Sequence, residues 1–164
     1  MQIFTGARRW LALVAVATGC AAPRPGVAAP AAVTTPAEVS AAARATLEQW
    51  RQAYEVRSAD ALARLYVHDP GLSVIQDGTL LLGWSAVEPM LRDRLGKASA
   101  IRVRIKDVQV SAVGLTGAVV VAAMLRERSE AATTVTENGV ITLVLARDDA
   151  GWAILCEHYS YKRP

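Results

Sequence analysis

The sequence has few of the residues on which metal centres, disulfide frameworks and nucleotide sites depend. Its 164 residues include 2 cysteines and 2 histidines. Cys20, Cys156, His68 and His158 lie far apart in the chain, so they form no cluster with the spacing of metal ligands. No glycine-rich loop follows an apolar strand pattern, and a phosphate cradle is therefore not expected. We predict neither a metal nor a cofactor.

An excess of one charge is also lacking. The chain has 18 basic and 15 acidic residues, and removal of residues 1–19 would take Arg8 and Arg9 with it, leaving 16 against 15. Nucleic-acid binding requires a concentrated basic surface, so no nucleic-acid partner is expected. Aromatic residues make up only 5% of the chain, whereas hydrophobic residues make up 52%. This composition and length suit one domain with a core and an extension.

The first 35 residues have the pattern of an export signal and a spacer. Two arginines precede an apolar run at residues 10–18, which is shorter than the ~20 residues that span a bilayer. The run ends in small residues before Cys20, and this ending resembles the bacterial lipobox. We predict a lipoprotein signal peptide at residues 1–19, a lipid anchor on Cys20 and an Ala/Pro-rich tether at residues 20–35. Ordinary cleavage after residues 15–17 is the alternative.

This prediction has consequences for location and for the second cysteine. The protein would be exported and membrane-anchored, on the periplasmic side of the outer membrane in a Gram-negative cell. With Cys20 lipidated, Cys156 would have no disulfide partner in the chain. A cysteine in an apolar strand is usually a small buried hydrophobic residue.

The domain at residues 36–164 begins with a helical pattern. Apolar residues recur at offsets of four, three and four, which places them on one helix face. These residues are Ala43, Leu47, Trp50 and Tyr54. Pro36 suits the start of this helix, and Ser58 can cap a second, shorter helix. The spacing of Ser85 and Glu88 predicts a capping box at the start of a third helix.

Strand patterns dominate the rest of the domain. Short strands are expected at residues 72–75 and 79–82, and a hairpin turn at residues 148–151. From residue 100 onward, apolar runs or alternating patterns predict longer strands separated by short turns. They lie at residues 100–106, 118–125, 139–146 and 152–161. Helices followed by a meandering antiparallel sheet predict an α+β fold.

The last strand holds the strongest candidate site. A period of two places five side chains on one face. They are Trp152, Ile154, Cys156, His158 and Ser160. Because this face begins with apolar residues, we expect it to face the interior, with His158 and Ser160 near a pocket mouth. The mixed charges at residues 126–130 predict a solvated strand end.

Together these features resemble the SnoaL-like branch of the nuclear transport factor 2-like superfamily, over residues 39–162. The resemblance rests on four features in order. They are the helix with Trp50 and Tyr54, the segment LYVHD at residues 65–69, Gly78 and Gly83 around a short strand, and the ending WAILCEHYS at residues 152–160. The resemblance implies a cystatin-like cone, in which a curved antiparallel sheet wraps around three N-terminal helices. It also implies a pocket at the open end and a homodimer formed through the sheet.

From these residues we predict a lipid-anchored envelope protein that binds, without catalysis, a small, largely apolar molecule or a partner protein. The predicted binding residues are Trp50, Tyr54, Tyr66, Trp84, His158 and Ser160. Trp84 either lines the pocket or forms a hydrophobic staple at a helix start, and we favour the staple.

Two alternatives remain open. The first is an isomerase, cyclase or dehydratase with His158 as base and Tyr54 or Tyr66 as proton donor. The steroid isomerase branch needs a carboxylate on the first short strand, and residues 72–75 (LSVI) contain none. The second is a structural dimerisation module.

Overall fold

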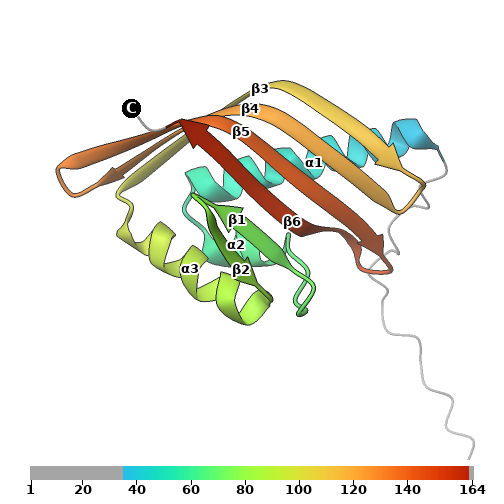
Figure 1. The fold of residues 1–164 in the computed structure, drawn as a ribbon, viewed down its shortest axis with the longest axis horizontal. Coiled ribbons are helices and arrows are strands. Elements are labelled where there is room, and N and C mark those ends of the chain that lie inside the picture. Colours follow the sequence, from blue (N-terminus) through green and yellow to red (C-terminus); the bar gives the residue numbers. More distant parts are fainter. Residues whose placement is uncertain (1–34, 163–164) are drawn as a thin grey trace, which may run out of the picture.

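The computed structural model describes residues 35–162, so the predicted signal peptide, Cys20 and nearly all of the tether lie outside the described residues. Helices and strands follow one another along the chain as shown in Figure 1. They are α1 (Pro36–Glu55), α2 (Ala59–Ala63), β1 (Ser73–Gln76), β2 (Thr79–Leu82), α3 (Trp84–Lys97), β3 (Ala100–Val113), β4 (Gly117–Glu130), β5 (Thr133–Asp148) and β6 (Gly151–Lys162). Within this part of the chain, no helix is both long and apolar enough to cross a membrane.

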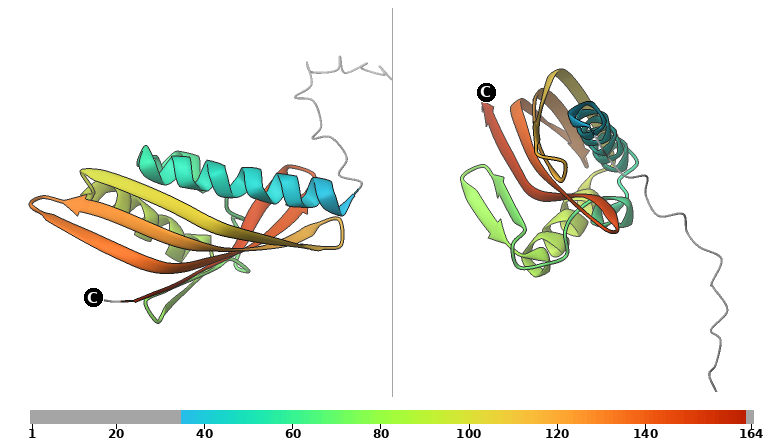
Figure 2. Two further views of the ribbon diagram at one scale, coloured as in Figure 1. Left: turned by 90° about the horizontal axis from the view of Figure 1, so that it is seen from above. Right: turned by 90° about the vertical axis from the view of Figure 1, so that its right-hand side faces the viewer.

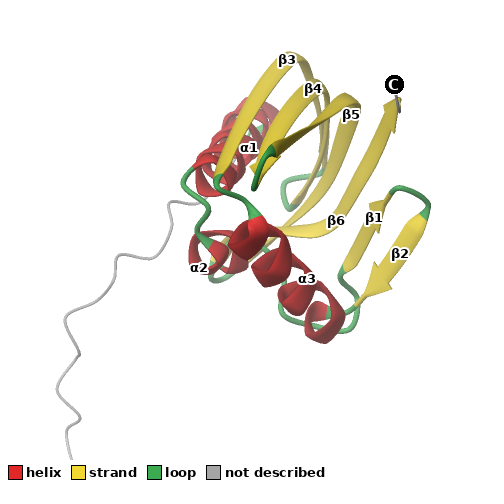
Figure 3. Cartoon of the chain, turned by 90° about the vertical axis from the view of Figure 1, so that its left-hand side faces the viewer, coloured by secondary structure: helices red, strands yellow, loops and turns green. Residues whose placement is uncertain are grey.

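The strands form one curved sheet in the order β2-β1-β6-β5-β4-β3. The four long strands make the expected antiparallel meander, and β1 adds to β6 in parallel. Helix α1 lies across the inner face of the long strands (Figure 2). The β1–β2 hairpin forms the edge of the sheet opposite β3, and helix α3 lies next to it (Figure 3). The predicted α+β class with a curved sheet around N-terminal helices is confirmed.

The start of α1 follows from its local sequence. The Thr35 hydroxyl accepts a hydrogen bond from the Glu38 backbone N–H at 3.3 Å, and the Glu38 carboxylate accepts one from the Thr35 N–H at 2.9 Å. Pro36 occupies the first turn, where its missing N–H costs nothing. The predicted apolar face is fully buried. Ser58 caps α2 as predicted, because its Oγ accepts from the Ala61 N–H at 3.1 Å.

The start of α3 differs from the prediction. The helix begins at Trp84, and its N-cap is Gly83, which has φ of 76° and provides no side-chain cap. The capping box of Ser85 and Glu88 is therefore wrong, because the helix starts one residue before Ser85. The staple is wrong as well, because Trp84 is the first helical residue and its ring stacks on His68 at 4.1 Å. The left-handed φ of Gly83 is easily accessible to glycine and sets the direction in which α3 leaves β2.

A one-residue bulge interrupts the pairing of β6 with β5. Val144 pairs with Cys156, but the next residue of β5, Leu145, pairs with Ile154. Leu155 is therefore an extra residue in β6 with no opposite partner. Such an insertion shifts the alternation of all later side chains by one position.

The bulge reverses which side chains of β6 enter the interior. Ile154, before the bulge, is buried as expected. After it, Glu157 and Tyr159 are buried, at 1% and 2% exposure, whereas His158 and Ser160 are exposed. The prediction that His158 and Ser160 face the interior is therefore wrong. A strict period of two cannot hold across an unpaired residue.

We predict that two alanine substitutions in β6 will show this orientation. Ile154→Ala should lower the free energy of unfolding by about 2–5 kcal/mol, because it leaves a cavity in the core. His158→Ala should change it by less than about 0.5 kcal/mol, because the ring projects into solvent. Urea unfolding of the full-length chain measures both values. A large loss for His158→Ala would contradict the orientation.

Candidate functional site

A buried hydrogen-bond network joins α1, the segment after α2 and β6. The Glu157 carboxylate accepts hydrogen bonds on Oε2 from the Tyr66 hydroxyl and, at 3.1 Å, from Trp50 Nε1. Trp50 Nε1 also lies 3.1 Å from the Tyr66 hydroxyl oxygen. Buried polar groups need such partners, since an unmade hydrogen bond costs the free energy of desolvation. These hydrogen bonds hold α1, the segment after α2 and β6 together.

A second buried cluster surrounds Arg126 of β4. Its Nε donates to Glu137 Oε2 at 2.5 Å, and its Nη1 donates to the Tyr159 hydroxyl at 3.0 Å. The guanidinium carbon lies 4.6 Å from the ring centroid of Tyr159 and 5.3 Å from that of Tyr54. Both distances suit cation–π contacts. The prediction of a solvated strand end is wrong for Arg126, which is 1% exposed.

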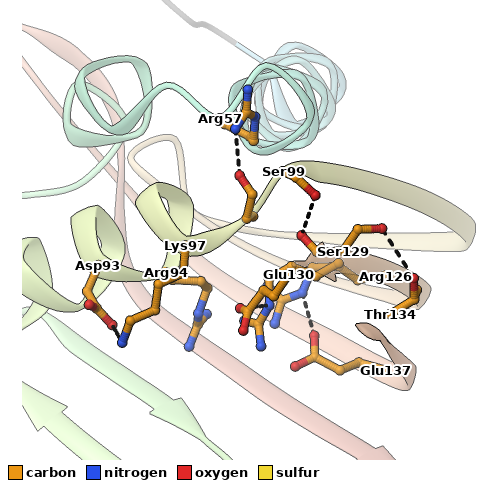
Figure 4. Close-up of polar contacts among 12 residues, drawn as sticks. Arg57, Asp93, Arg94, Lys97, Ser99, Arg126, Ser129, Glu130, Thr134 and Glu137 are labelled. Atoms are coloured by element: carbon orange, nitrogen blue, oxygen red, sulfur yellow. Dashed lines mark hydrogen bonds and ion pairs between the residues drawn. The ribbon is translucent and has the colours of Figure 1, made fainter. Parts of the chain in front are cut away.

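A cavity of about 390 Å³ lies beside this cluster. Helix α3, the β1–β2 hairpin and the ends of β4, β5 and β6 contribute its lining. The lining residues are Val74, Gln76, Asp77, Thr79, Leu81, Met90, Arg94, Arg128, Glu137 and Tyr161. Arg94 donates to the Gln76 side-chain oxygen, and Arg128 pairs with Glu130 at 2.8 Å. Figure 4 shows Arg94 of α3 near the charged residues of β4 and β5.

Burial controls the protonation of this region. It raises the pKa of Glu157, although the Tyr66 hydrogen bond and the charges of Arg126 and Arg94 act in the opposite direction. Burial also raises the pKa of Tyr66 and Tyr159 well above the ordinary value. Tyr66 therefore keeps its proton and is the donor in its hydrogen bond to Glu157.

The structure brings together four of the six predicted binding residues. The rings of Trp50 and Tyr54 have centroids 4.5 Å apart, and Tyr66 lies 6.2 Å from Trp84. These side chains belong to the core and not to the lining of the cavity. Tyr54 approaches the cavity indirectly, because it contacts Arg126, whose ion-pair partner Glu137 lines the cavity.

The other two predicted residues, His158 and Ser160, lie on the outer face of the sheet, away from this cluster. Cys156 is partly exposed and has a free thiol, so it is not the fully buried residue that was expected. Among residues 35–162, no group of three or more histidine, cysteine or acidic side chains could hold a metal ion.

Sequence reasoning missed the charged residues of the site. Arg126 continues the inward alternation of Ala122 and Met124, and Glu137 is in phase with buried Ile141. The alternation of inward and outward side chains could therefore have identified both residues as buried, but their charge was taken to mean exposure to solvent. The sequence pattern did not indicate that Glu157 is buried, because the bulge shifts the alternation of β6 before this residue. Arg94 is on a helix that was predicted, but its direction depends on how α3 packs.

Comparisons with known proteins agree on the fold. The family profile of the SnoaL-like domain matches residues 43–164. A solved structure from Streptomyces avermitilis, named as a candidate dehydratase of the NTF2-like family, has 20% identity and a TM-score of 0.72; the match covers 79% of this chain and 100% of that chain. An NTF2-like superfamily protein from Salmonella enterica has 18% identity and a TM-score of 0.71, covering 78% and 94%.

A third solved structure, a candidate scytalone dehydratase from Novosphingobium aromaticivorans, has 15% identity and a TM-score of 0.68, covering 75% and 83%. At these identities the likeness concerns the fold alone. No curated protein matches the sequence significantly.

The raised pKa of Glu157 predicts a pH dependence of stability. The folded protein binds this proton more tightly than the unfolded chain, so the contribution of Glu157 to stability is lost as pH rises through its folded pKa. In the wild type, the free energy of unfolding should therefore decrease as pH rises above about 4.3, the ordinary pKa of glutamate. In Glu157→Gln this decrease should be smaller.

Tyr66→Phe is the companion variant. It removes the hydrogen bond that lowers the pKa of Glu157, so the fall should extend to higher pH. Denaturant unfolding between pH 4 and 8 measures both effects. Identical pH profiles for the wild type and Glu157→Gln would contradict the assignment.

Proposed function

The chain belongs to the SnoaL-like domain family, and from this premise we propose that it binds a small organic molecule in its cavity without transforming it. The observation behind this proposal is the cavity between α3, the β1–β2 hairpin and the long strands. Its volume of about 390 Å³ falls in the range of small-molecule sites, ~300–1,000 Å³. Val74, Leu81 and Met90 contribute apolar side chains to its lining, and Asp77, Arg94, Arg128 and Glu137 contribute charged ones.

Catalysis by the predicted histidine has no support in the geometry. His158 is exposed on the outer face, whereas Tyr54 and Tyr66 are buried inside. A base and a proton donor must reach the same substrate, and these side chains cannot do so across the sheet.

We also propose that the outer face of the sheet forms a homodimer. Val121 and Val140 are 37% and 42% exposed on the adjacent strands β4 and β5. Ala123 pairs with Val140, so these residues make one apolar surface. A second copy would cover it and remove apolar area from water.

We propose that the chain is attached to a membrane through Cys20. Its support is the order of basic residues, apolar run and small residues before Cys20, followed by an Ala/Pro-rich spacer. The binding domain would then be held close to the membrane surface by residues 20–35.

Ligand binding can be tested with the neutral apolar dye N-phenyl-1-naphthylamine. The full-length chain should bind it saturably, with one dye per chain. Met90→Trp should weaken binding about tenfold or more, because the indole occupies the cavity. Val113→Trp, at an exposed position of β3, should leave the affinity unchanged. Fluorescence titration makes the measurement, and equal affinity for wild type and Met90→Trp would sink the assignment of the cavity.

The dimer makes a separate prediction. Val140→Glu should convert the protein to a monomer, because the carboxylate would be desolvated at the interface. Val113→Glu provides the control, since Val113 is exposed but lies at the end of β3. Light scattering after size exclusion gives the mass. A monomeric wild type at all concentrations would refute the proposal.

A further inference from the structure

Three buried polar atoms in or behind the cavity wall have neither a hydrogen bond nor an ion pair within residues 35–162. They are the Tyr54 hydroxyl oxygen, Arg94 Nη1 and Arg126 Nη2, whereas the buried Arg128 Nε is paired with Glu130. Tyr54 and Arg126 are 0% and 1% exposed, so bulk water does not satisfy them. Buried polar groups are normally paired. Arg94 lines the cavity, so its unpaired Nη1 indicates a group that the ligand supplies.

The three groups come from different elements and converge. Arg126 of β4 lies against the Tyr54 ring of α1, with its guanidinium carbon 5.3 Å from the ring centroid. Burial and the charge of Glu157 raise the pKa of Tyr54, while the charges of Arg94 and Arg126 and a side-chain interaction with Arg94 oppose that rise, so both cations act on this hydroxyl. Arg94 lines the cavity directly, and Glu137, which pairs with Arg126, lines it as well.

The charged residues of the cavity lining differ in their partners. The lining has two cations, Arg94 and Arg128, and two anions, Asp77 and Glu137. Arg128 pairs with Glu130, and Glu137 pairs with Arg126. Within the described residues, Arg94 forms no ion pair; it donates to the neutral Gln76 amide and interacts with the Tyr54 side chain.

The other acidic residues occupy different positions. Asp77 also lines the cavity, but it lies in the exposed turn between β1 and β2. Glu157, which is buried, accepts hydrogen bonds from Tyr66 and Trp50, and the charges of Arg126 and Arg94 also act on it. Arg94 is therefore the cation of the cavity lining that has no ion-pair partner within the described residues, and its guanidinium matches an anionic group of a ligand.

We propose that the ligand is a small organic acid whose single anionic group binds Arg94. Tyr54 and Arg126 lie behind the lining, and the apolar part of the acid lies against Val74, Leu81 and Met90. Arginine suits this task, because its planar guanidinium can donate two parallel hydrogen bonds to one anionic group. The inference rests on the proposed function and names the class of molecule bound.

A matched pair of dyes tests the proposal on the full-length chain. 8-Anilinonaphthalene-1-sulfonate is N-phenyl-1-naphthylamine with one added sulfonate. The wild type should bind the sulfonate at least tenfold more tightly than the neutral dye. Arg94→Met should remove this preference and leave the affinity for the neutral dye within about twofold.

Gln76→Glu provides an independent variant that keeps every cation. It places a carboxylate where Arg94 now contacts a neutral amide, so the guanidinium would gain an ion-pair partner within the chain. The affinity for the sulfonate should fall about tenfold, with little change for the neutral dye.

The outcomes separate the two proposals. Equal binding of both dyes to the wild type, or an unchanged preference in both Arg94→Met and Gln76→Glu, overturns the organic-acid assignment but leaves the binding cavity. Absence of binding for both dyes overturns the binding function itself.

Discussion

The bulge at Leu155 determines which side chains of β6 enter the interior. The buried polar cluster depends on this orientation of the side chains. Without the extra residue, His158 and Ser160 would point inward, and Glu157 and Tyr159 would point to solvent. Arg126 would then lose the Tyr159 hydroxyl, and the Trp50 indole would lose its carboxylate. A buried charge that loses a partner is strongly destabilising, so the bulge and the cluster require each other.

The same dependence links the core to the cavity. Glu137 belongs to both, because it holds Arg126 inside and also lines the cavity. Arg126 in turn packs on Tyr54, whose hydroxyl is one of the unpaired groups. A molecule in the cavity would therefore contact Glu137, which the fold has already positioned through its ion pair with Arg126. Such preorganisation lowers the ordering cost of binding. Unpaired polar atoms are a stability cost that proteins tolerate mainly at functional sites.

Local patterns in the sequence predicted much of this architecture. The buried face of α1, the Ser58 cap and the meander of long strands all follow from periodicity and turn chemistry. The failures have specific physical causes. The pairing of β1 with β6 and the bulge at Leu155 depend on contacts between distant segments, which no local period contains. Arg126 was predicted to be exposed because it is charged, although its position in the alternation of β4 points inward. A series of inward-facing residues on a strand can end in a cation that has a buried partner.

The placement of Arg94 is the last consequence of these constraints. Gly83 turns the chain sharply from β2 into α3, and α3 carries Arg94 near the charged residues of β4 and β5 (Figure 4). The strands provide two ion pairs, whereas Arg94 forms none within the described residues. An acid with one anionic group could pair with its guanidinium, and a second negative charge would lie near Glu137, where a low local dielectric makes repulsion strong. If the proposed acid binds there, its charge would contribute to recognition together with the shape of the cavity.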